Sequence, residues 1–327
     1  MNRVYLCYKL TKGCYFKLKK ISILLMTVIL AVVSSCSKQN SEDGTIRIGE
    51  QYGLAYAPLQ IMKEKAFLEE LRPEVTVDWL KLGNTTAIRE AVLSGDLDAG
   101  FMGIPPFLIA RDKGMEWKIA TGLSRAPLGL VVPVNTYSNL SDFSKNSRIA
   151  LPQPGSIQHI LLTMAAERES GDPAMLDKNL ISLKHPDGMN ALLSGSVDGH
   201  FTSPPYLFYE NDNKDFEILV TGDEAMGEPF TFIIGAVTEK FYNENPELYN
   251  DYLAALEKSI NFIDTHRKET VEILSKAYSM DKDILSEFLY RPGMEFNTSV
   301  KGLERFISFM GERGYLENEL TVDSVLF

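Results

Sequence analysis

The stretch Ala91-Val-Leu-Ser-Gly-Asp-Leu-Asp-Ala-Gly-Phe101 recurs one hundred residues later as Ala191-Leu-Leu-Ser-Gly-Ser-Val-Asp-Gly-His-Phe201. A proline pair follows each copy, at Pro105-Pro106 and at Pro204-Pro205, so the alignment needs a gap of only one residue. Each copy has a helix with an apolar stripe, a Ser-Gly pair that ends it, a short strand, and prolines that begin the next helix. The repeat therefore predicts two lobes of the same design.

Strands and polar loops precede both helices of the repeat. Val75 to Leu82 has the pattern of a strand before the loop Gly83-Asn84-Thr85-Thr86, and Leu180 to Leu183 precedes the loop His185-Pro186-Asp187-Gly188. Strands that alternate with helices form parallel sheets, which bind ligands at the carboxyl ends of the strands. Two such lobes in tandem predict a cleft between them.

The order of the elements predicts how the lobes connect. Thr45 to Glu50 is the expected first strand, Leu128 to Pro133 fits a first crossover, and Phe230 to Val237 has the pattern of a return strand. From Thr238 onward the chain is expected to be helical, with later helices near Asp281 and Thr298. We predict an α/β fold in which residues 45–130 and 235–327 form lobe one and residues 131–234 form lobe two, joined by two hinge crossovers.

The first 36 residues differ in kind from the rest. They carry six basic residues and no acidic one. Their apolar run, Ile21 to Val33, would reach only about 20 Å as a helix, too short for a bilayer core. Val33-Ser34-Ser35-Cys36 resembles a bacterial lipobox, which implies cleavage before Cys36 and its acylation; the alternative is an ordinary signal peptide with an incidental cysteine. Residues 37–44 are polar and are expected to form a flexible tether.

Cysteine use and charge exclude several classes of protein. Cys7 and Cys14 fall within the predicted signal, so only Cys36 would remain, and neither a disulfide nor a thiolate nucleophile is expected. Residues 37–327 keep 27 of the 33 basic residues and all 44 acidic ones. This strongly acidic balance disfavours nucleic acid as a partner. It does not disfavour a small anion, because local dipoles in a pocket can oppose the global field.

Loops rich in hydroxyl, amide and glycine residues follow the expected strands. Helix starts favour anions through free N–H donors and a partial positive charge. The hydroxyl of Ser156 can cap its helix, touch a ligand, or both, and Tyr52 and Tyr56 can form an apolar wall or belong to the core. The repeat suggests that Gly103-Ile104 and Thr202-Ser203 face each other across the cleft. The predicted ligand-binding residues are Gln51, Tyr52, Tyr56, Asn84, Thr85, Thr86, Gly103, Ile104, Ser156, Ile157, Gln158, Thr202 and Ser203.

The sequence offers little for catalysis or for a metal. The four histidines share no metal-ligand spacing, and the chain lacks a nucleophile elbow, a zinc-protease motif and a glycine-rich phosphate loop. His185 and Asp187 could form a catalytic pair; alternatively, Asp187 caps the helix at Met189 while His185 packs locally. Arg125 either neutralises an anion or lies on the surface. We expect no metal and no cofactor.

Four motifs together resemble one family of binding proteins. Tyr56-Ala57-Pro58-Leu59, Leu93 to Gly100, Gly103-Ile104-Pro105-Pro106 and Gly155-Ser156 are similar to the nitrate, sulfonate and taurine family of periplasmic binding proteins, which includes binders of thiamine-pyrimidine precursors. The resemblance extends from Ile46 to about Tyr278. It implies a type II periplasmic-binding-protein fold.

The same resemblance implies a role in transport. The chain would be the lipid-anchored, monomeric substrate-binding component of an ABC importer, outside the cytoplasm. It would capture a small organic anion, similar to a sulfonate or nitrate, and deliver it to a permease and its ATPase. The alternative is an enzyme or sensory domain on the same fold that acts on a thiamine-pyrimidine-like heterocycle. A pyrimidine synthase of this superfamily carries cysteines at its site, and this chain has none after Cys36.

Overall fold

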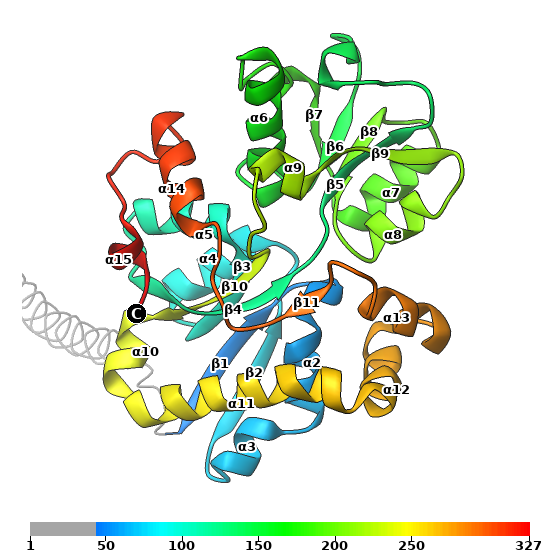
Figure 1. Cartoon of the computed structure of the whole chain (residues 1–327). Coiled ribbons are helices and arrows are strands. Elements are labelled where there is room, and N and C mark those ends of the chain that lie inside the picture. Colours follow the sequence, from blue (N-terminus) through cyan, green and yellow to red (C-terminus); the bar gives the residue numbers. More distant parts are fainter. Residues whose placement is uncertain (1–43) are drawn as a thin grey trace, which may run out of the picture. The chain divides into compact units, whose positions relative to one another are not determined.

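The computed structural model describes residues 44–327, which form two α/β lobes, each built on its own sheet (Figure 1). The predicted signal, the lipobox with Cys36, and nearly all of the expected tether lie outside the described residues. The two sheets confirm the predicted fold class.

The first sheet has six strands. The first three strands along the chain pair in parallel with one another, and every other pairing in this sheet is antiparallel. In spatial order they are β11 (Glu295–Phe296), β4 (Trp117–Arg125), β10 (Ile233–Thr238), β3 (Ala99–Gly103), β1 (Thr45–Glu50) and β2 (Thr76–Lys81).

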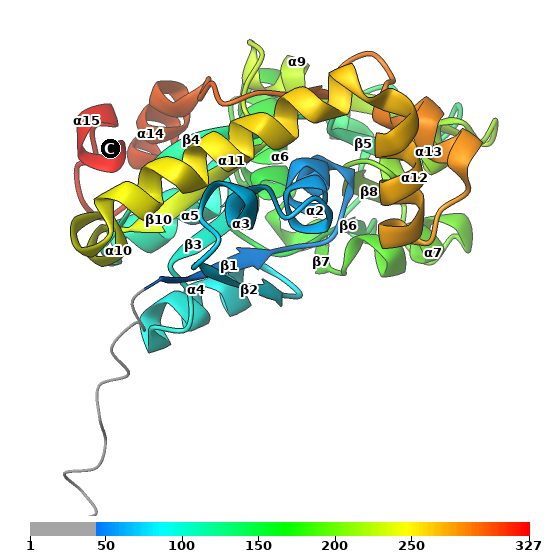
Figure 2. The ribbon, with the colours of Figure 1, turned by 90° about the horizontal axis from the view of Figure 1, so that it is seen from below.

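Helices cover both faces of the first sheet. Figure 2 shows the long helix α11 crossing α2 and α3 on one side of β1 and β2, with α4 on the other side. Apolar residues such as Ile46, Ile48 and Phe101 are fully buried between these layers. The helices are η1 (Leu54–Tyr56), α2 (Ala57–Glu64), α3 (Phe67–Leu71), α4 (Thr85–Ser94), α5 (Ile104–Asp112), α10 (Glu239–Glu244), α11 (Pro246–Thr265) and α12 (Arg267–Tyr278).

The second sheet has five strands and its own helices. Its strands, in spatial order, are β7 (Leu180–Ser182), β6 (Ile149–Leu151), β8 (Gly199–Thr202), β5 (Gly129–Pro133) and β9 (Phe216–Thr221). The helices are η2 (Leu140–Asp142), α6 (Ile157–Ser170), η3 (Asp177–Asn179), α7 (His185–Leu193), α8 (Tyr206–Asn211) and α9 (Gly222–Met226).

The chain crosses between the sheets twice, through short segments. It leaves the first sheet after Arg125 and enters the second at Gly129, so most of the expected crossover is strand β5. Leu130 pairs with Phe201 in the second sheet, and Ile233 pairs with Gly103 in the first. Each change of sheet thus falls a few residues before the expected boundary. An apolar run has the same pattern in an extended linker as in a paired strand, which is why the sequence did not separate them.

The repeated unit appears in both lobes, with two differences from the prediction. The proline pair lies in the first turn of α5 in the first copy, but α8 in the second copy begins only after Pro205. α4 and α7 are each followed by a glycine in the left-handed region, Gly95 at φ 81° and Gly195 at φ 68°. In the second copy the expected loop is already helical, because Pro186 fits a first turn. Asp187 therefore lies in that first turn and caps nothing; the N-cap position is held by Lys184, whose side chain makes no capping bond.

The last part of the chain returns to the first sheet and passes beside the second lobe. α13 (Lys282–Leu289) begins after Asp281, as predicted, and the side chain of Asp281 caps it. The helix expected near Thr298 begins later, as α14 (Leu303–Glu312), because residues 295–296 first pair with β4. α15 (Val322–Val325) follows.

Candidate functional site

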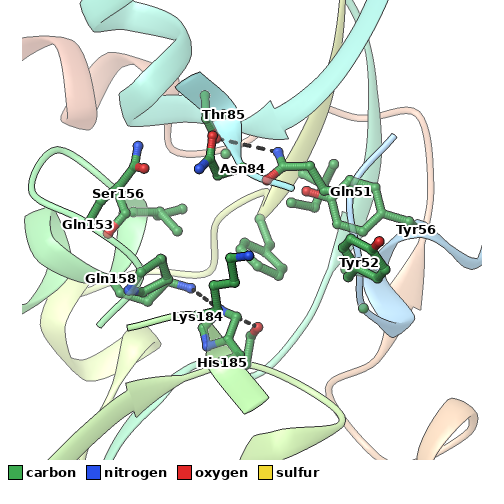
Figure 3. A pocket seen from close by; sticks show the side chains of 18 of the residues that line it. Gln51, Tyr52, Tyr56, Asn84, Thr85, Gln153, Ser156, Gln158, Lys184 and His185 are labelled. Carbon is green, nitrogen blue, oxygen red and sulfur yellow. Dashed lines mark hydrogen bonds between the residues drawn. The ribbon is translucent and has the colours of Figure 1, made fainter. Parts of the chain in front are cut away.

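A cavity of about 340 Å³ lies between the lobes and is lined by loops of both. Its size falls within the range of small-molecule sites. Ten of the thirteen predicted residues line it: Gln51, Tyr52, Tyr56, Asn84, Thr85, Gly103, Ser156, Ile157, Gln158 and Ser203. Figure 3 shows the polar side chains from the two lobes around one space.

The other three predicted residues do not line the cavity. Thr86 lies within α4, one residue past the cavity wall. The side chains of Ile104 and Thr202 are fully buried in the protein interior. The predicted loops meet at one cavity, but not every predicted side chain faces it, because neighbouring residues at a strand end or helix start point to different sides.

Helices from both lobes begin at the cavity. The N-cap residues of α4, α5, α6 and α7 all line it: Asn84, Gly103, Ser156 and Lys184. Asn84 Oδ1 accepts the N–H of Ala87 at 3.0 Å, and Ser156 Oγ accepts that of His159 at 3.3 Å. The two polar loops are thus helix caps as well as cavity walls. Four positive helix ends around one space favour a bound anion.

The side chains that line the cavity carry charge of only one sign. No Asp or Glu is among the residues that line it, and its single lysine is Lys184. Within residues 44–327, no carboxylate lies within ion-pair distance of Lys184, which extends into the cavity in Figure 3. Sequence reasoning missed Lys184, although the repeat offered a signal, since Lys184 occupies the position of Asn84 in the second copy.

His185 forms part of the cavity wall and holds its neighbours in place. Its Nδ1 lies 2.9 Å from Thr202 Oγ1, and its Nε2 lies 3.3 Å from Gln158 Nε2. Burial, with the neighbouring His200, lowers the pKa of His185 to about 3, so the ring is neutral at physiological pH. With the Gln158 amide as drawn in Figure 3, its N–H donates to Nε2 and the ring donates from Nδ1 to Thr202. The structure shows no hydrogen bond between His185 and Asp187, so the possible catalytic pair is not assembled.

The aromatic residues after β1 have different surroundings. Tyr56 is 5 % exposed, so it belongs to the core and also walls the cavity. Tyr52 is 62 % exposed, with Lys81 Nζ 4.4 Å from its ring centre. Gln51, which precedes Tyr52, is held by β3 and α4. Its Nε2 donates to the carbonyl of Phe101 at 3.1 Å and to Thr85 Oγ1 at 3.4 Å.

Arg125 lies away from the cavity, where the chain leaves the first sheet. Its guanidinium pairs with Asp223 of the second lobe and, at 2.9 Å, with Glu295 of the first. Both carboxylates already balance its charge. Of the two sequence interpretations of Arg125, the structure therefore supports a role outside the ligand site.

The described residues contain neither a membrane-spanning helix nor a metal-binding cluster. No helix within residues 44–327 combines the length and the hydropathy that a membrane crossing needs. In the same part of the chain, no group of three or more His, Cys, Asp or Glu side chains is placed to hold a metal ion.

Comparison with known proteins relates the chain to solute-binding proteins. A model of the NMT1-like family matches residues 39–279. The taurine-binding periplasmic protein of Escherichia coli (strain K12) is 27% identical over 179 residues, which cover 53% of this chain and 53% of that relative. The matched stretch thus spans about half the length of the curated relative.

Solved structures share the fold over most of the chain. The alkanesulfonate-binding protein SsuA from Xanthomonas axonopodis pv. citri, bound to MOPS, has a TM-score of 0.74 at 20% identity, covering 88% of this chain and 99% of its own. The nitrate-binding protein NrtA from Synechocystis PCC 6803 has a TM-score of 0.67 at 15% identity, covering 86% and 83%. At these identities the likeness establishes the two-lobed periplasmic-binding-protein fold.

Proposed function

The chain belongs to the NMT1-like family, and we propose that it is the substrate-binding component of an ABC importer. It captures a small organic anion between its lobes, acts as a monomer, and delivers the ligand to a membrane permease and its ATPase. One observation carries the proposal: four helix N-termini and Lys184 meet at one cavity that has no carboxylate in its lining.

The shape of the cavity supports an organic ligand with an acidic group at one end. Helix starts and Lys184 supply the donors for a sulfonate or similar anion. Tyr56, Phe232 and Ile157 supply apolar wall for the rest of the molecule. The cavity has roughly ten times the ~30 Å³ that one water occupies in the liquid, so nitrate alone would leave most of it unfilled. An alkyl or cyclic sulfonate fits this combination better than an inorganic anion does.

A thermal-shift screen tests the proposal. The panel contains alkanesulfonates, nitrate, amino acids and pyrimidines, and a ligand at 100 times its dissociation constant adds about 2.7 kcal/mol to stability. We expect a sulfonate to raise the melting temperature, and Thr85→Ala with Ser156→Ala to reduce that rise. Thr238→Ala is the matched control, because Thr238 caps α10 with its hydroxyl far from the cavity lining. A screen in which no anion stabilises the chain would refute the proposal.

The lining also bears on taurine, the ligand in the name of one relative. Taurine carries an ammonium group, and here no carboxylate lines the cavity to pair with it, while Lys184 repels it. We expect propane-1-sulfonate to bind at least about tenfold more tightly than taurine, since an unpaired desolvated charge costs more than ~1.4 kcal/mol. Gln153→Glu places a carboxylate in the lining, and the ratio should then fall. Calorimetric titration of both compounds measures it; equal affinities in the unaltered chain would contradict this assignment.

The lipid anchor at Cys36 is part of the same proposal and is supported by the lipobox-like sequence. Acylation would hold the binding domain at a membrane outside the cytoplasm, with each buried CH₂ contributing about 0.8 kcal/mol. Labelled palmitate should be incorporated by the natural chain and by Cys14→Ser but not by Cys36→Ser. A natural chain that incorporates no label would favour an ordinary signal peptide, and label that persists in Cys36→Ser would contradict acylation at Cys36.

We also propose that the chain has no enzymatic activity. An enzyme or sensory domain on this fold would need a reactive group in the cavity, and His185 is the candidate. Both of its ring nitrogens already contact neighbouring side chains. Turnover of a pyrimidine ligand that disappears in His185→Ala, with binding retained, would favour the enzyme instead.

A further inference from the structure

The last 47 residues, 281–327, form a segment that we call the strap, and it contacts both lobes. It includes α13, β11, α14 and α15 and lies beyond the residues that the family model matches. Figure 1 shows it passing from α13 near α8 to α14 near α6. The cavity and the proposed transport role do not account for this arrangement.

The strap is fixed to the first lobe. β11 pairs with β4, and the carboxylate of Asp112, at the end of α5, accepts the backbone N–H groups of Glu317 and Asn318 at 2.9 and 2.8 Å. Although burial opposes ionisation, these two N–H groups and the Asn318 amide lower the pKa of Asp112. The strap therefore moves with the first lobe when the lobes separate.

The strap meets α8 of the second lobe through Arg291, just after α13. Arg291 Nη1 and Nη2 donate to the two oxygens of Asp212 at 2.9 and 2.8 Å, a bidentate pair. The same guanidinium lies 4.4 Å from the ring centre of Phe208 and 4.9 Å from that of Phe288. Phe288 of the strap also packs edge-on against Phe208 and Tyr209 of α8. A paired and stacked arginine is held more firmly than an ordinary surface ion pair.

A second contact joins the strap to α6. Arg313 pairs with Glu167 across the lobes. Tyr315 Oη lies 3.3 Å from Thr163 Oγ1, and its ring meets that of His159 edge-on. The strap therefore contacts two helices of the second lobe, and these contacts must break if the second lobe swings away.

Both of these helices begin at the cavity. Ser156 and Gln158 at the start of α6 line it, as do Tyr206 at the start of α8 and Ser203 in the loop before that helix. Asp212 is the residue directly after α8, so a single short helix joins the ligand-facing and the strap-facing residues. A contact that holds this end of α8 also holds the cavity wall in its ligand-binding position.

We propose that Arg291 is a positioning residue: its pair with Asp212 holds the lobes in the ligand-binding arrangement and raises affinity without touching ligand. An affinity measured for a chain that is only partly in its binding arrangement is reduced by the fraction in that arrangement. The inference rests on the proposed binding function, but its main test needs no ligand. The two can therefore fail separately.

The test measures the distance between the lobes. Residues 44–327 contain no cysteine, so the full chain with Ser at positions 7, 14 and 36 accepts two spin labels in detergent. Leu93→Cys and Leu193→Cys are suitable sites, because these residues are 68% and 47% exposed and lie on different lobes. We expect one narrow distance distribution in the ligand-free parent and a broader or longer one in Arg291→Ala. Asp212→Asn, which changes the second lobe alone, should act in the same way.

A control variant and a charge-exchange double variant test whether the effect belongs to this ion pair. Arg72→Ala removes an arginine that pairs with Asp251 inside the first lobe, and it should leave the distances unchanged. The exchange Arg291→Asp with Asp212→Arg should restore the parent distribution at least in part. For propane-1-sulfonate, Arg291→Ala should weaken binding about three- to tenfold, mainly through faster dissociation. Distances in Arg291→Ala and Asp212→Asn that match those of the parent would overturn the proposal, whether or not any sulfonate binds.

Discussion

The two copies of the repeated unit solve one packing problem in opposite ways. In the first lobe, Ile88 of α4 fills the space over Gly100 of β3, where an added Cβ would lie 2.9 Å from Ile88 Cγ2. In the second, the large residue is on the strand: His200 of β8 lies under Gly188 of α7, where an added Cβ would lie 2.4 Å from His200 Nε2. The helix positions correspond one hundred residues apart, and so do the strand positions. Both copies therefore fill the space between helix and strand, but with an apolar side chain in the first and a polar one in the second.

In the second lobe, the histidine on the strand forms a buried polar pair with a residue of α8. His200 Nδ1 lies 2.6 Å from Glu210 Oε1, and both side chains are fully buried. Burial raises the pKa of Glu210 to about 9 and lowers that of His200 to about 3. At neutral pH the pair is therefore a protonated acid that donates to a neutral imidazole. His185, whose ring centre lies 5.6 Å from that of His200, is likewise kept neutral beside the cavity.

The largest effect on stability at constant pH is expected from placing a large side chain at Gly188, where the strand residue His200 already fills the space. Gly188→Ile forces a side chain into His200 and should lower the free energy of unfolding by about 3 kcal/mol or more. Adding His200→Gly recreates the arrangement of the first lobe and should recover part of the loss. Urea denaturation of both single variants and the double variant measures this coupling, and strictly additive effects would show that the two positions do not share one space.

The second effect is a pH dependence that arises from the buried pair of Glu210 and His200. Glu210 has a raised pKa in the folded chain, so its contribution is complete below the unfolded value near 4.5 and is lost as pH rises toward 9. His200 has a lowered pKa, so its contribution is present above about 6.5 and is lost as pH falls toward 3. Between pH 6 and pH 9 the natural chain should lose about 4 kcal/mol relative to Glu210→Gln, at about 1.4 kcal/mol per pH unit. Parallel stability curves across this range would contradict the protonated state of Glu210.

The third prediction concerns the residues that begin α4 and α7. Lys184→Asn gives the second copy the cap of the first, so it should stabilise the fold by up to about 1 kcal/mol. The same change removes the only lysine of the cavity and should weaken propane-1-sulfonate binding about tenfold. Chemical denaturation and calorimetry separate the two outcomes. A variant that loses stability and affinity together would show that Lys184 is structural.

The smallest effects should be equal in the two lobes. Gly95 and Gly195 both have positive φ, and an added Cβ at either would meet no atom within 4 Å. Gly95→Ala and Gly195→Ala should therefore each cost only the strain of the left-handed conformation, about 1 kcal/mol. Unequal losses, measured by denaturation, would show that one helix end depends on more than backbone geometry.

Local patterns were enough to predict much of the fold from the sequence. The Ser-Gly ends of α4 and α7, the helix that starts near Asp281 and the first strand need only neighbouring residues. The limits of the crossovers were less accessible, because pairing partners decide whether an apolar run such as Gly129–Pro133 joins a sheet. The same holds for α7, whose first turn includes residues that have the sequence pattern of a loop.

The site was predictable as a set of loops but not as a charge distribution. Ser156, Asn84 and Gln51 follow strand ends, and the sequence located them. Lys184 has no local signal that separates it from a surface lysine. The pair between Arg291 and Asp212 joins residues 79 positions apart on different lobes, so only the folded chain brings them together.

The central claim is that the two unlike copies hold one ligand between them. Calorimetric titration of propane-1-sulfonate into the full chain, into Thr85→Ala of the first lobe and into Lys184→Asn of the second tests it most directly. The account predicts one ligand per chain and weaker binding in both variants, with the larger loss in Lys184→Asn. Binding that is unchanged when either lobe is altered would contradict a shared site between them.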